Sequence, residues 1–250
     1  MFWFKRKKIV VDCFINSEFM VNNVPIVHSI KSTPNWWKSL PSKVNITGDS
    51  GIEKELGTIK KCIGFQDLYK NSFTLSMWSD LHIKNDEHGM SWEFSDSNSR
   101  IDTHNPLQWG YNFKNMRHLK IMCPWILKEK TGCNFAYIKE TWGSLDNDDY
   151  HRVTVLPAVV NFKYQHHLHI NAFIPDAKNT YSIKLGTPVV HLIPMTENDV
   201  EFKSHSLFEN EFNALKTSTS FPTVSGGYNF AKNKSEEREN EKKKCPFHFK

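Results

Sequence analysis

The sequence predicts a mainly β protein: a single domain with a β-sandwich or jelly-roll fold and a few short peripheral helices. Many segments alternate apolar and polar side chains, as half-buried strands do. Aromatic residues make up 13% of the chain and Ala is scarce, which favours strands packed around large rings. The sequence lacks the regular succession of strand and helix patterns that is typical of a doubly wound fold.

The first quarter of the chain predicts one strand and two short helices. Residues Ile9 to Ile15 alternate and are rich in β-branched side chains, so they indicate a strand. Thr33 and Pro34 form a helix-entry signal and Pro41 a stop, which predicts a short helix carrying Trp36 and Trp37. Apolar residues at helical spacing predict a second helix between residues 58 and 69.

The middle of the chain changes to strand patterns. A strand over residues 73–83 and another over 91–95, joined by turn-forming residues, predict a hairpin. Further strands are expected at residues 118–123, 134–137, 152–164, 166–174, 180–184 and 188–193. An amphipathic helix over 206–216 completes a globular domain of residues 1–227, and residues 228–250 form a charged tail that is either an exposed helix or flexible.

Charge and cysteine content indicate the class of protein. The formal net charge of +5 comes largely from lysine runs at the two ends of the chain, which are typical of a solvated surface, so a nucleic-acid partner is not expected. Five scattered cysteines without a Cys-x-x-Cys pair argue against a disulfide framework and for a reducing compartment. The apolar stretches are too short for membrane insertion. We therefore expect a soluble protein of the cytoplasm.

The most informative motif is a pair of histidines, His167 and His169, followed further along the chain by His191. On a strand, His167, His169 and Asn171 project from one face, and a neighbouring strand supplies a third imidazole. Three converging imidazoles are a common set of ligands for a divalent metal such as iron, zinc or manganese. The alternative is that His167 and His169 lie on a polar outer face and His191 is a hydrogen-bonded core residue.

This motif is similar to the cupin signature, in which a His-x-His strand is followed by a Gly-x-Pro-like turn and a third His. Gly186, Pro188 and His191 fit the second part. The resemblance implies a metal-dependent enzyme of oxygenase or isomerase type. The sequence departs from the pattern where a glutamate is expected, because Ala172, Phe173 and Ile174 stand there.

Other polar residues suggest a ligand site that is separate from the histidine motif. Asp80 and His82 can share a strand face, and with His104 or His118 they would give the two-His-one-carboxylate set of non-haem iron enzymes. Alternatively, an aromatic ring beside hydrogen-bonding side chains could bind a sugar or a base, with a buried structural Trp as the simpler interpretation. The candidate ligand-binding residues are Trp78, Asp80, His104, Gln108 and Trp109.

Several well-defined motifs are absent. The sequence has no Gly-x-Ser-x-Gly, no phosphate-binding loop and no dinucleotide fingerprint. The acidic run Asp146 to Asp149 lacks the glycine and glutamate of an EF-hand loop. No catalytic residue can be assigned from motifs alone.

Five segments, in this order and at this spacing, resemble an uncharacterised family of proteins from tailed bacteriophages, especially marine ones: residues 4–14, 34–41, 75–81, 118–125 and 186–194. The resemblance implies a viral origin and expression in the host cytoplasm, but no activity. Two functions stay open: a non-catalytic binding or structural protein with a virion or host protein as partner, and a cupin-like metalloenzyme.

Overall fold

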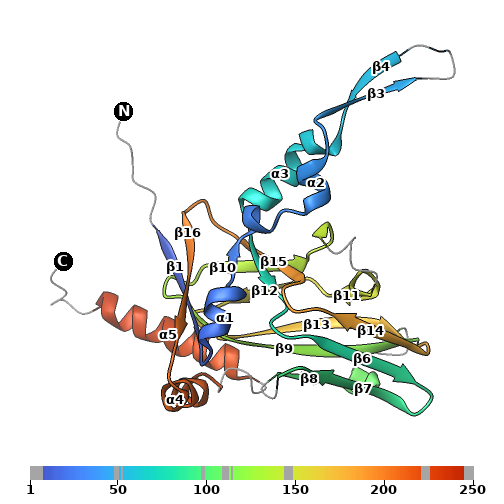
Figure 1. Cartoon of the computed structure of the whole chain (residues 1–250). Coiled ribbons are helices and arrows are strands. Elements are labelled where there is room, and N and C mark those ends of the chain that lie inside the picture. Colours follow the sequence, from blue (N-terminus) through green and yellow to red (C-terminus); the bar gives the residue numbers. More distant parts are fainter. Residues whose placement is uncertain are drawn as a thin grey trace, which may run out of the picture.

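A computed structural model describes residues 8–47, 51, 53–96, 99–108, 113, 115–143, 149–220 and 226–244. The prediction of a mainly β fold with few short helices is confirmed, and two large sheets pack face to face as a sandwich (Figure 1). One pair of adjacent strands, β1 (Ile9–Ile15) and β16 (Val200–Ser206), is parallel. A jelly roll is built from antiparallel strands, so we describe the fold as a β-sandwich.

The first layer is a sheet in the order β11-β13-β9-β1-β16, with β8 paired to β9 beside β1. Its other strands are β8 (Arg100–Asp102), β9 (Met116–Lys128), β11 (Thr154–Val155) and β13 (His167–Pro175). The long antiparallel pair of β9 and β13 forms its centre. We call it the histidine sheet because His167 and His169 lie on it.

The second layer is a sheet in the order β12-β10-β15-β5-β2. Its strands are β2 (Val27–His28), β5 (Phe73–Ser76), β10 (Asn134–Lys139), β12 (Ala158–Asn161) and β15 (Pro188–Pro194). A three-stranded sheet in the order β14-β6-β7 continues from it, made by β6 (Leu81–Asp86), β7 (Gly89–Phe94) and β14 (Asn179–Ile183). Backbone hydrogen bonds between Met77 and the turn at Gly186 and Thr187 connect the two sheets.

The core lies between the layers. Phe202 of β16 packs against Phe73 of β5, with ring centroids 4.5 Å apart, and against Phe135 of β10 at 5.8 Å. Trp125 of β9 is fully buried. The large rings thus fill the space between two sheets, as the aromatic composition predicts.

Three strand predictions need correction. The predicted strand over 73–83 is two strands, β5 and β6, because the chain turns at Met77 to Asp80. The predicted strand over 152–164 is also two, β11 and β12, and each pairs in a different layer. β16 was not predicted, although this strand covers the edge of β1, and neither were the short strands β2 and β8.

The helices are short and lie at the periphery. They are α1 (Glu18–Asn23), α2 (Asn35–Ser39), α3 (Ile63–Lys70), α4 (Glu209–Thr219) and α5 (Gly227–Lys244), with 3-10 turns at Ser29–Ser32, Ile59–Lys61, Pro106–Gln108 and Tyr150–Arg152. The tail therefore continues as a helix, one of the two predicted alternatives. No helix among the described residues is long and apolar enough to cross a membrane.

A separate arm projects from the sandwich. It consists of α2, α3 and the two-stranded hairpin of β3 (Lys43–Thr47) and β4 (Glu53–Gly57), which extends away from the body (Figure 1). Trp36 of α2 attaches the arm to the body, because its Nε1 donates to the Trp142 carbonyl (2.9 Å), whereas Trp37 stacks on Phe65 of α3 inside the arm. The predicted short helix thus exists as α2 and contacts the body through Trp36, whereas the hairpin was not predicted.

Candidate ligand-binding site

The structure places His167 and His169 together and His191 elsewhere. His167 and His169 are half-buried on the outer face of the histidine sheet, with rings stacked at 6.5 Å, while Leu168 and Ile170 point into the core. His191 is fully buried on β15 of the other layer. The three-His site is therefore not formed, because β15 belongs to the opposite sheet. The alternative of two outer-face histidines and a core histidine describes the structure.

The described residues also contain no other group of three or more His, Cys, Asp or Glu side chains arranged to hold a metal ion. In particular, Asp80 and His82 do not form the iron-binding set with His104 or His118. Asp80 Oδ1 accepts the backbone N–H of Leu185 (2.7 Å), and His82 is exposed on β6. The rings of His104, in the loop after β8, and His118, on β9, instead lie against each other with centroids 4.9 Å apart and planes tilted by 51°.

His191 belongs to a buried polar network of side chains from β15, from the end of β10 and from the base of the arm. Ser29 Oγ lies 3.0 Å from its Nδ1 and Ser72 Oγ 3.3 Å, while Glu140 Oε1 faces its Nε2 at 3.6 Å. The hydroxyl of Tyr69 donates to the same carboxylate oxygen of Glu140 (2.5 Å). Buried polar groups need such partners, so the network explains why a histidine is tolerated in the core.

The network also sets the pKa of its carboxylate. Burial alone would raise the pKa of Glu140, but the facing His191 imidazole, the Tyr69 hydroxyl and the backbone N–H of Gly143 together outweigh burial and lower it. Burial and the bond to Glu140 raise the pKa of Tyr69. Ser29, His191 and Glu140 include the residue types of a hydrolytic triad, but all three are closed off from solvent, so we assign them a structural role.

His167 and His169 line a small pocket between the histidine sheet and helix α4. The pocket has a volume of about 130 Å³, and Arg100 and Lys216 stand at its wall with Glu209 and Asn213. Strand register explains the placement, because Arg100 of β8 and His169 of β13 both pair with Met122 of β9. Arg100, Met122 and His169 thus form one row across three strands, with the two polar side chains on either side of the methionine.

Both histidines of this pocket are held neutral. Burial lowers the pKa of each to about 4, with smaller contributions from nearby cations, Lys216 for His167 and Lys120 for His169. His167 Nε2 lies 3.2 Å from the hydroxyl of Thr219. His169 Nε2 is buried without a hydrogen-bond partner among the described residues. At neutral pH the pocket therefore offers a hydrogen-bonding ring nitrogen beside two cationic side chains.

A second pocket adjoins the first and contains Trp78 and Asp80, two of the predicted ligand-binding residues. Its volume is about 400 Å³, and it shares Asn16 and Pro124 with the histidine pocket. Its apolar lining comes from six residues on five segments: Ile15, Phe19, Met20, Trp78, Pro124 and Leu185. We call the two adjoining pockets the Asn16 cleft.

The carboxylates of the second pocket are already bonded within the chain. Asp80 accepts the N–H of Leu185 (2.7 Å), and Asp96 accepts the N–H and the hydroxyl of Ser99 (2.8 and 2.6 Å). Trp78 is buried and its indole N–H donates to Ser99 Oγ (2.8 Å). Its ring therefore lines the pocket but is not accessible for stacking against a ligand ring. Phe19 and Leu185, which are 54% and 41% exposed, are instead the accessible apolar groups.

The remaining predicted ligand residues lie apart from this cleft. His104 Nδ1 lies 3.1 Å from Gln108 Oε1 near the 3-10 turn after β8. Neither residue lines the Asn16 cleft. Trp109 lies outside the described residues, as do Asp146 to Asp148 of the acidic run. Trp78, Asp80 and the two histidines thus line the same cleft, whereas His104 and Gln108 lie outside it.

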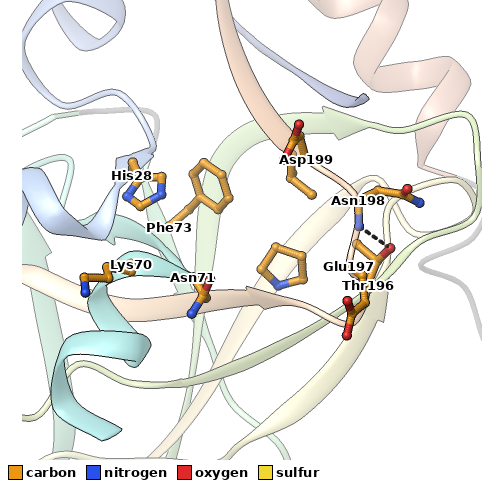
Figure 2. A pocket seen from close by; sticks show the side chains of 10 residues that line it. His28, Lys70, Asn71, Phe73, Thr196, Glu197, Asn198 and Asp199 are labelled. Carbon is orange, nitrogen blue, oxygen red and sulfur yellow. Dashed lines mark hydrogen bonds between the residues drawn. The ribbon is translucent and has the colours of Figure 1, made fainter. Parts of the chain in front are cut away.

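A third hollow lies at the other end of the second layer, next to the base of the arm (Figure 2). It has a volume of about 480 Å³ between α3, β2, β5 and the loop that connects β15 to β16. Figure 2 shows Lys70 and His28 on one side and Glu197 and Asp199 on the other, with a hydrogen bond from the Asn198 N–H to Thr196 Oγ1 (3.2 Å). Cationic and acidic side chains both line this hollow, so its chemistry does not favour one class of ligand over another.

No motif in the sequence predicts the apolar half of the Asn16 cleft. Phe19, Met20 and Leu185 come from a short helix and a loop, and neither has a motif. Ser17 caps the helix by accepting the N–H of Met20 (3.3 Å), and a serine at this position is a local signal from which α1 could have been predicted.

Comparison with known proteins adds no assignment: no family model and no curated protein matches the chain.

Proposed function

We propose that this chain is a non-catalytic binding protein, and that the Asn16 cleft receives a segment of a partner protein. The observation that carries the proposal is the junction of two chemically different pockets at Asn16 and Pro124. A concave site with apolar walls and a few converging polar groups is the usual form of a binding site.

The chemistry of the cleft defines the segment. The second pocket has its carboxylates bonded internally and presents Phe19, Met20 and Leu185, so it suits an apolar side chain. The histidine pocket presents Arg100 and Lys216 beside a single carboxylate, Glu209, so its charged lining is net positive and suits a carboxylate. A peptide with Leu or Phe close to Asp or Glu satisfies both halves.

A binding role is preferred to a cupin-like enzyme because His191 lies in the other sheet. The two remaining imidazoles have stacked rings and no third ligand in the part of the chain that the structure describes. The resemblance to phage proteins fits this role, since a virion or host protein would then be the partner.

Fluorescence polarisation with labelled short peptides tests the proposal. The probes carry one Leu or Phe and a nearby Asp, and each has an Asp→Asn counterpart. We expect Lys216→Glu and Leu185→Asp each to weaken binding by about tenfold, and the Asn peptides to bind less tightly. Lys178→Glu is the matched control, because this exposed lysine follows the opposite end of β13.

Two results would reject the proposal. One is that no acidic-apolar peptide binds better than peptides without an apolar side chain. The other is that Lys178→Glu weakens binding as much as Lys216→Glu, which would indicate a general effect of charge.

A further inference from the structure

The hairpin of the arm has two edges with opposite character. β4 carries Glu53, Lys54 and Glu55 in succession, and charged side chains are a common protection of an open sheet edge. β3 carries a single charge, Lys43, followed by Val44, Asn45, Ile46 and Thr47. Its composition favours strand pairing, and in the described chain β3 pairs only with β4.

The hairpin also has an apolar face with little to cover it. Val44 pairs with Leu56 across the two strands, and Ile46 lies on the same face. These side chains are 38%, 45% and 44% exposed, respectively. An isolated two-stranded hairpin is marginally stable in water, and further strands are the usual remedy.

We infer that the β3 edge pairs with the β3 edge of a second copy of this chain, in antiparallel orientation about Asn45. The arrangement gives one four-stranded sheet across two molecules. It goes beyond the proposed function, because the arm takes no part in the Asn16 cleft.

Self-complementarity favours a second copy as the occupant. With Asn45 opposite Asn45 of the other copy, Val44 meets Ile46, so the apolar faces become continuous. Lys43 meets Thr47, so no like charges oppose each other. The same pairing through β4, centred on Glu55, would place two carboxylates face to face, which is unfavourable.

The location of the hairpin leaves room for this pairing. It lies at the far end of the arm, well away from the body of the molecule (Figure 1). The contact involves only five residues of each copy, so we expect a weak, reversible dimer rather than a permanent one.

Sedimentation velocity over a range of protein concentrations tests the inference. Wild type should shift from monomer to dimer as concentration rises. Asn45→Lys should weaken the association by about fivefold or more, because two lysines then oppose each other across the symmetry axis. Inside its own hairpin the new lysine would pair with Glu55, the cross-strand neighbour of Asn45, so the arm should stay folded.

Two further samples make the test specific. Glu53→Gln changes the net charge by the same amount on the β4 side and should dimerise like wild type. A mixture of Asn45→Lys with Asn45→Glu/Glu55→Gln should associate more strongly than either variant alone, because opposite charges then meet at the axis. Glu55→Gln removes the carboxylate that the new glutamate would otherwise face inside its own hairpin. A monomeric wild type at every concentration, or a dimer that Asn45→Lys does not weaken, would overturn the inference.

Discussion

His191 and the pair His167 and His169 share a sequence motif but occupy opposite environments. His191 lies in the core, where Ser29 Oγ is 3.0 Å from Nδ1 and the carboxylate of Glu140 faces Nε2 at 3.6 Å, an ion-pair distance that is too long for a hydrogen bond. His169 lies half-buried on an outer face with an unpartnered Nε2 among the described residues. The difference shows that spacing along the chain does not determine which histidines meet, because the intervening chain crosses from one sheet to the other.

The largest loss of stability is expected for a substitution of the core histidine, His191. His191→Ala removes the partner of a buried carboxylate and leaves a cavity, so it should lower the free energy of unfolding by about 3–5 kcal/mol. Urea unfolding of the variant and of His169→Ala measures the contrast. Equal losses in the two variants would show that the two environments do not differ in the way described.

The second largest effect is a pH dependence of stability that His167 and His169 cause. Both histidines have a pKa of about 4 in the folded protein, below the ordinary value of 6.5. Between pH 4 and pH 6.5 the unfolded chain binds more protons than the folded chain does. The free energy of unfolding is therefore highest above pH 6.5 and decreases as the pH falls towards 4.

Through these two histidines, lowering the pH from 7 to 5 should reduce the free energy of unfolding by about 2 kcal/mol. This figure is half of what the pKa difference alone would give, because both side chains are partly exposed. Urea unfolding across this range measures it, with His167→Gln/His169→Gln as the comparison. The double variant should have the shallower dependence, and an unchanged slope would contradict the lowered pKa values.

The third effect returns to the core network. Tyr69→Phe deletes one hydroxyl that donates to Glu140 (2.5 Å) and keeps the ring. Loss of a hydrogen bond to a buried carboxylate should destabilise the protein by about 1.5–3 kcal/mol. Thermal and urea unfolding provide the measurement, and Tyr164→Phe, on a half-buried ring, is a control that should change stability by less than about 0.5 kcal/mol.

The smallest effect is expected for His169 alone. Its Nε2 makes no hydrogen bond within the described chain, so His169→Leu should change stability at neutral pH by less than about 1 kcal/mol. Because Leu cannot bind a proton, the variant should also lose part of the pH dependence. A loss as large as that of His191→Ala would show that His169 has a structural partner outside the described residues.

The local features of the fold were predictable from local patterns. Alternation predicted that His167 and His169 share one face opposite Leu168 and Ile170, and it predicted β1 over the same residues, Ile9–Ile15, that form it in the structure. The entry and stop signals around Trp36 located α2 to within two residues. These features depend on residues close in the chain, whose side-chain directions are fixed by the backbone geometry of a strand or helix.

Other features required the tertiary structure. Nothing in the sequence of β16 states that it pairs in parallel with β1, nearly two hundred residues away, or that β15 joins the sheet opposite β13. The apolar half of the Asn16 cleft likewise comes from segments without any motif.

The sequence by itself therefore determined the β class of this protein, most of its strands and which side chains share a strand face. The tertiary structure alone decided which strands become neighbours, and with that the separation of His191 from the outer histidines and the meeting of Trp78 and Asp80 with Asn16. The physical reason is that side-chain periodicity is local, whereas the pairing of distant strands is selected by the burial of apolar surface over the whole chain.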